Sequence, residues 1–212
     1  MTRAAGIAAL IAPVTVVLGW AFGALAQPNA YSSVHDDVSD LGAVTAASPW
    51  LYNQVASNLT GLLLVVVSLG LWHALSPNTL GRAGAVTLGV SGVGAILDGF
   101  FRLDCRGIDS GCVNDSWHAH AHKVESAFTA ATILLAPLIL AFAFRRIEGW
   151  RSAWLPTLAA IPGLIAAEVI FSTWGDGAAT RAGTLVVFAW IAYLGVRLLR
   201  VASVERGPTA AG

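Results

Sequence analysis

Six long apolar stretches, separated by short polar segments, are the feature that most restricts how this chain can fold. They run over residues 4–26, 51–74, 83–103, 117–144, 152–174 and 180–200. A helix needs about 20 mostly apolar residues to cross the hydrocarbon core of a bilayer, and each stretch meets that length. Because a backbone in lipid must satisfy its own hydrogen bonds, these stretches predict an all-α bundle of six transmembrane helices.

The composition of the chain indicates that lipid, rather than water, is its main solvent. Of its 212 residues, 56% are hydrophobic and only 11% are charged, whereas a soluble domain has about 25% charged residues. The net charge is zero, and no basic stripe is present to bind nucleic acid. We expect a single membrane domain over residues 1–200, surrounded by membrane lipid, and a short polar tail over residues 201–212.

The distribution of basic residues predicts the orientation of the helices. Loops rich in arginine and lysine favour the cytoplasmic side of a membrane. With the N-terminus in the cytoplasm, four basic residues lie outside and eight lie inside, the latter being Arg3, Arg82, Arg145, Arg146, Arg151, Arg197, Arg200 and Arg206. We therefore expect both termini in the cytoplasm, and a plasma (inner) membrane location in a bacterium.

The first apolar stretch has an alternative interpretation as a cleaved signal peptide. Ala24, Leu25 and Ala26 resemble the small-residue site that precedes cleavage. The apolar region of a signal peptide is usually about 7–15 residues long, whereas this stretch is longer and contains Pro13 and Trp20. A retained first helix is favoured, and cleavage would leave five helices.

Most of the ionisable side chains in or near the apolar stretches belong to one side of the membrane. Asp98 lies near the end of the third stretch, a histidine-rich block from His118 to Glu125 opens the fourth, and Glu168 lies in the outer half of the fifth. Asp40 follows Ser39 in the first outer loop, where Ser39 is a helix cap or, beside a base, a nucleophile. Polar groups in a membrane are costly and therefore have partners or a function.

The histidine block predicts a metal site. On a helix, His118 and His122 lie one turn apart on one face, Glu125 shares that face, and His120 points nearly opposite. Two imidazoles at this spacing suit zinc, and nearby carboxylates complete such a site. The sequence leaves the cofactor unknown, with zinc as the candidate; in that hypothesis His118, His122, Asp98 and Asp104 are the ligands, and Glu125 and Glu168 are the catalytic groups that transfer protons.

Two alternatives to this metal site remain open at the level of sequence. Asp98 and Arg102 are one helical turn apart, a spacing that predicts an intrahelical ion pair. The histidines also suit a hydrated network with the loop carboxylates, or a pH-sensing role, because the pKa of histidine is near neutral.

Cys105 and Cys112 share one polar loop and are separated by six residues. The expected orientation places this loop outside the cell, where disulfides form. A bridge is therefore favoured over two free thiols.

Three short motifs give the chain a family resemblance. They are the outer loop ending in Ser39-Asp40-Leu41-Gly42, the segment from Gly99 to Cys105, and the block from His118 to His122. With these motifs the chain resembles the domain-of-unknown-function 998 family of bacterial membrane proteins. The resemblance implies a bundle of about six helices and assigns no activity. A looser similarity is to membrane hydrolases that hold zinc near one membrane face, such as alkaline ceramidases.

These observations lead to two functional hypotheses. The first is a metal-dependent hydrolase of a lipid or amide at the outer leaflet, because bound zinc lowers the pKa of its water to about 7 and supplies hydroxide. The second is a non-catalytic sensor, a partner-binding subunit or a small transporter, in which the same residues form a structural network. Sequence alone does not decide whether the chain is an enzyme.

Overall fold

The computed structural model describes residues 1–28 and 30–204, and every regular element in those residues is helical. The elements are α1 (Thr2–Ala26), η1 (Val38–Gly42), η2 (Leu51–Leu59), α2 (Thr60–Ala74), α3 (Thr79–Asp98), α4 (Trp117–Phe144), η3 (Arg151–Ala153), α5 (Trp154–Ser172) and α6 (Asp176–Val204). Counting η2 with α2 and η3 with α5, six helices in the described residues are long and apolar enough to cross a membrane. The predicted all-α architecture is confirmed.

The third and sixth helices differ most from their expected bounds. α3 begins at Thr79, where the side chain of Asn78 accepts a hydrogen bond from the Gly81 amide at 2.7 Å, and it ends at Asp98 instead of residue 103. α6 begins at Asp176, whose charge suits the positive end of a helix dipole, and continues to Val204. The helix thus extends into the predicted tail, and residues 205–212 lie outside the described residues.

The start of the second membrane helix is a π-helix, which the sequence pattern does not predict. Across η2 each turn is wider than in an α-helix, and the hydroxyl of Thr60 donates to the carbonyl of Val55 at 3.3 Å. Single π turns occur frequently at functional sites. This segment buries Tyr52, Asn53 and Ser57 toward the bundle interior.

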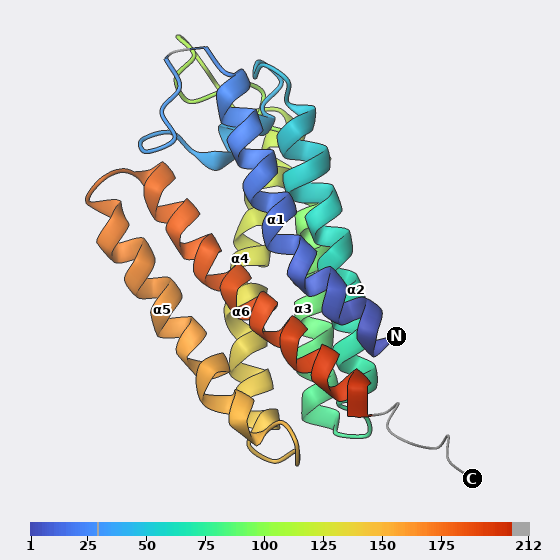
Figure 1. Ribbon diagram of the computed structural model, residues 1–212. Coiled ribbons are helices and arrows are strands. Elements are labelled where there is room, and N and C mark those ends of the chain that lie inside the picture. Colours follow the sequence, from blue (N-terminus) through green and yellow to red (C-terminus); the bar gives the residue numbers. More distant parts are fainter. Residues whose placement is uncertain (29, 205–212) are drawn as a thin grey trace.

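The six membrane helices of the described residues are arranged in a ring. Each helix packs against its neighbours in the chain, and α6 packs back on α1 (Figure 1). Glycines permit the closest approaches: a Cβ on Gly61 of α2 would lie 2.5 Å from the carbonyl oxygen of Gly92 on α3, and one on Gly195 of α6 would lie 2.9 Å from that of Gly6 on α1. Small residues have this role wherever helices meet in lipid.

The ring has two distinct ends. The start of α1 and the end of α6 lie together at the terminal end, whereas residues 30–50 and 99–116 gather at the opposite, loop end (Figure 1). The interior of the terminal half is filled by large, fully buried side chains, namely those of Leu71, Leu75, Leu140, Phe144, Ile191, Leu194 and Leu198. The start of α1 and the end of α6 thus lie on one side of the bundle, and the cytoplasmic location expected for the termini stays a prediction.

A cross-linked polar loop covers part of the loop end. The predicted bridge between Cys105 and Cys112 is present, with a Cα–Cα distance of 5.7 Å. Within the bridged loop Arg106 forms an ion pair with Asp109 at 2.6 Å, and the hydrogen bond from the Arg106 side chain lowers the pKa of Asp109 to about 2. Arg106 also donates to the side chain of Gln27 at 3.2 Å, which links the loop to the end of α1.

Candidate functional site

A cavity of about 480 Å³ occupies the centre of the ring in its loop half. Pockets for small molecules have volumes of about 300–1,000 Å³, so this cavity is of ligand size. Every membrane helix contributes to its wall, and so does η1; examples are Trp20 of α1, Ser39 of η1, Ser57 of η2, Ser91 of α3, Ile133 of α4, Leu164 of α5 and Thr184 of α6.

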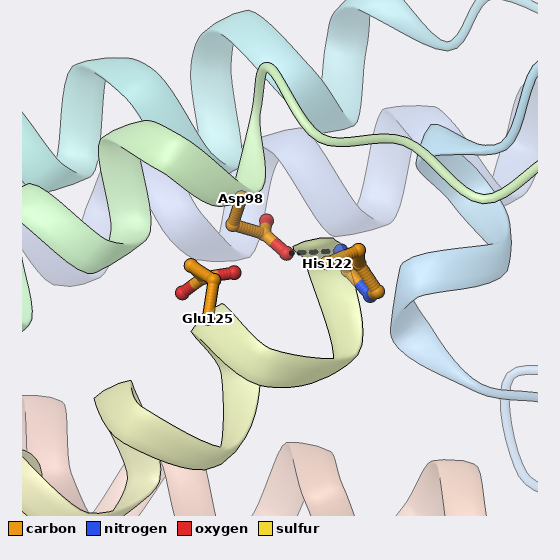
Figure 2. Close-up of side chains that lie close together, drawn as sticks. All are labelled: Asp98, His122 and Glu125. Atoms are coloured by element: carbon orange, nitrogen blue, oxygen red, sulfur yellow. Dashed lines mark ion pairs between the residues drawn. The ribbon is translucent and has the colours of Figure 1, made fainter. Parts of the chain in front are cut away.

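Three ionisable side chains meet at the wall of this cavity. Asp98 is the last residue of α3, and His122 and Glu125 lie on the first turns of α4 (Figure 2). Each offers one ligand atom, and these atoms lie within 4.8 Å of one another. We call Asp98, His122 and Glu125 the polar triad. The spacing of His122 and Glu125 predicted a shared helix face, and both are buried.

The two carboxylate oxygens of Glu125 differ in their hydrogen bonds. Oε1 accepts a hydrogen bond from the hydroxyl of Thr129 at 2.7 Å. Oε2 is buried and has no hydrogen-bond partner among the described residues, and the whole residue is only 8% exposed. Buried polar atoms in native proteins nearly always have a partner. This oxygen can therefore take a proton, a hydrogen-bond donor or a cation from the cavity that Glu125 lines.

Asp98 is fixed from two sides. The hydroxyl of Ser57 donates to Oδ2 at 2.5 Å, and Nδ1 of His122 lies 3.2 Å from Oδ1. The π-helix η2 supplies Ser57 and thereby joins the second membrane helix to the triad. The predicted ion pair between Asp98 and Arg102 is wrong, because α3 ends at Asp98, and in the described part of the chain its ionic partner is His122.

The surroundings of His122 determine which ring nitrogen carries a proton. Nδ1 lies 3.0 Å from the carbonyl oxygen of Phe101 and also faces Asp98. Because a carbonyl oxygen only accepts, Nδ1 is the donor and Nε2 is the unprotonated nitrogen of the neutral ring. For Nδ1 to bind a cation, its proton has to move to Nε2 or leave.

Two further predicted residues line the cavity beside the triad. Glu168 does so from α5, where Gly183 of α6 accommodates it: a Cβ on Gly183 would lie 2.7 Å from Cγ of Glu168. Ser39 lines the cavity from η1. Asp40, its neighbour, is buried, accepts hydrogen bonds from the Gly107 amide at 3.1 and 3.2 Å, and has a raised pKa because of that burial. Asp40 thus fastens the disulfide loop to η1.

The structure leaves the other predicted residues outside the triad. His118 is exposed, and its ring lies 3.7 Å from that of Trp117. His120 is exposed beside the carbonyl of Ser116 at 2.9 Å. Asp104 accepts from the amides of Asp115 and Ser116 at 3.1 and 3.0 Å, and hydrogen bonds from Ser116 lower its pKa. Asp104 therefore stabilises the start of α4, and the histidine block does not converge on one point.

Sequence reasoning missed Ser57 and Thr129, which hold the two carboxylates of the triad. A signal for each was present, because both are polar residues within apolar stretches. The direction of the Ser57 side chain could not be predicted, because η2 is a π-helix and α-helical periodicity does not describe its turns.

Six apolar helices around a cavity with buried polar groups define an integral, multi-pass membrane protein. Within that class the chain belongs to the family described as protein of unknown function (DUF998), whose model matches residues 10–197. The resemblance seen in the three short motifs is confirmed. No curated protein and no solved structure matches the chain.

Proposed function

We propose that this protein is a metal-dependent membrane hydrolase that cleaves a lipid ester or amide, with a divalent cation such as zinc held by the polar triad. The observation that carries the proposal is the buried, unpaired Oε2 of Glu125, which lies beside the Asp98–His122 pair at the edge of a ligand-sized cavity. A cation between the three side chains gives this oxygen the positive partner that it lacks.

The chemistry of the triad suits this role. Three protein ligands leave a fourth position of zinc for water, as in catalytic zinc sites, and bound zinc lowers the pKa of that water to about 7. Ser57, which bonds the second oxygen of Asp98, acts as the outer partner that orients a metal ligand. Glu168, on the α5 wall of the same cavity, is the group that we assign to proton transfer.

One observation favours a second candidate. Nδ1 of His122 lies between two acceptors, Asp98 and the carbonyl of Phe101, a geometry that also suits a metal-free proton relay. In that case the protein is a sensor, a partner-binding subunit or a small transporter. Both candidates place the triad on the outer side of a bacterial inner membrane, as the basic residues favour.

Metal analysis of the detergent-purified protein, prepared without chelators, separates the two candidates. We expect near-stoichiometric zinc in the parent and its loss in His122→Ala and Glu125→Gln. His118→Ala is the matched control, because His118 lies one turn earlier on α4 but outside the triad. Circular dichroism and gel filtration report whether each variant remains folded.

The possible results have distinct meanings. Zinc retained in His118→Ala but lost in His122→Ala makes a hydrolase assay with lipid esters and amides the next step. Equal loss in both histidine variants would place the metal on the exposed part of the histidine block. A parent protein without metal would rule out the hydrolase proposal and leave the proton relay.

A further inference from the structure

The cavity is polar at one end and apolar at the other. The triad lies at the polar end, and the apolar wall is formed by Ile133 and Leu134 of α4, Leu64 of α2, Leu164 of α5 and Phe188 of α6. Ile133 follows Glu125 by eight positions, which at the rise of an α-helix is about 12 Å along the axis. The cavity therefore leads from the triad toward the middle of the bilayer.

The wall between α4 and α5 is open in the same half of the molecule. At the terminal end the two helices are held together, because Phe144 stacks on Trp150 at 4.8 Å and Arg145 lies over Trp154 at 4.9 Å. In the loop half, however, α5 buries no residue beyond Leu164. The residues that line the cavity on both sides of this seam are exposed, namely Ser126 and Ala130 of α4 and Ile165 and Glu168 of α5.

The charges around the cavity restrict the polar part of a ligand. Four lining residues carry carboxyl groups and one, His122, carries a basic group; the carboxyl groups are those of Asp37, Asp98, Glu125 and Glu168. Such a site disfavours an anionic head group, because like charges repel. A neutral head group avoids this repulsion.

We propose that the ligand is a single-chain amphiphile with a neutral head group, such as a monoacyl glyceride, which enters sideways from the bilayer between α4 and α5. Its acyl chain lies against Ile133, Leu134 and Leu164, and its ester or amide linkage lies at the triad. The binding step does not depend on a metal. Only the cleavage of that linkage rests on the proposed function.

Photolabelling tests the lateral entry. The protein is reconstituted in phosphatidylcholine vesicles with a monoacylglycerol that carries a diazirine in its acyl chain. Ala130→Trp fills the mouth of the cavity, whereas Ala131→Trp adds the same side chain at the next, equally exposed position, which does not line it. A tenfold loss of affinity corresponds to about 1.4 kcal/mol, which is within the usual cost of overpacking a packed site. We therefore expect Ala130→Trp to reduce labelling about tenfold. Ala131→Trp should label like the parent.

A second pair of variants, on α5, keeps the test valid if the Ala130→Trp variant of α4 does not fold. Ile165→Trp lies at the seam and lines the cavity, and Val169→Trp lies one turn further along α5, 64% exposed and outside the cavity lining. We expect loss of labelling only in the first of these. The label itself should map to the part of α4 that contains Ile133 and Leu134.

The results distinguish this inference from the proposed function. Parent protein stripped of zinc with a chelator should still be labelled, because the binding step does not depend on the metal. Equal labelling of Ala130→Trp and Ala131→Trp, or label spread evenly over the lipid-facing surface, would overturn the inference even in a protein that holds zinc. Selective labelling in a protein without zinc would support it and reject only the hydrolase.

Discussion

At the scale of single residues, a glycine makes room for the triad. α3 presents Gly94 to α4, where an added Cβ would lie 3.3 Å from Oε1 of Glu125 and closer still to the side chain of Thr129. The hydrogen bond between Thr129 and Glu125 is therefore formed directly against the backbone of α3. Any larger residue at this position has to push α4 outward.

Gly94→Ala is expected to lower the free energy of unfolding by about 1–3 kcal/mol, the usual cost of overpacking, and to weaken zinc binding. Gly23→Ala is the control, because its new methyl group would meet Leu41 at 3.5 Å, an ordinary contact. Both changes gain the same helix propensity, so this term cancels in the comparison. Denaturant titration in detergent measures the difference. Equal stability of the two variants would show that α4 adjusts to the methyl group freely.

At the scale of elements, the sequence predicted which segments are helices better than which turn reaches the interior. The spacing of His118 and His122 placed both on one face, but His122 is buried in the ring, whereas His118 is exposed and lies against Trp117. Asp98, His122 and Glu125 could be selected because ionisable residues stand out in apolar stretches. Ser57 could not be placed beside Asp98 from the sequence, because the direction of its side chain depends on the π-helical geometry of η2.

The disulfide loop connects α3 to α4 and so influences the position of the triad. Within it the side chain of Asn114 accepts hydrogen bonds from the amides of Asp104 and Cys105 at 2.7 and 3.2 Å, just before α4 begins. The cross-link therefore restricts the segment that separates Asp98 from His122.

Replacing both cysteines, as Cys105→Ser with Cys112→Ser, should lower the free energy of unfolding by about 2–3 kcal/mol, the loop-closure entropy of a bridge this short. Thermal unfolding of the purified protein measures the loss. Reductant added to the parent should reproduce it and should leave the double variant unchanged. A parent protein whose unfolding does not respond to reductant would contradict this account.

At the scale of the whole molecule, the arrangement of the ring gives the orientation a chemical consequence. The start of α1 and the end of α6 lie at one end (Figure 1), and the residues of the triad line the cavity in the other half. Four arginines in or beside the helix connections at the terminal end favour that end as cytoplasmic, namely Arg82, Arg145, Arg146 and Arg151. In this orientation, which stays a prediction, the triad would face the outer leaflet.

Reporter fusions should therefore give opposite signals at the two ends of the ring. A fluorescent protein that matures only in the cytoplasm should be bright on the C-terminus, and a phosphatase that is active only outside should be active when inserted after Gly111 in the disulfide loop.

The same orientation predicts that a membrane-impermeant chelator strips zinc from right-side-out vesicles and spares inverted ones, because the triad lies in the outer half of the bilayer. Fluorescence from the loop fusion, or zinc loss confined to inverted vesicles, would reverse the orientation and place the cavity in the cytoplasmic leaflet.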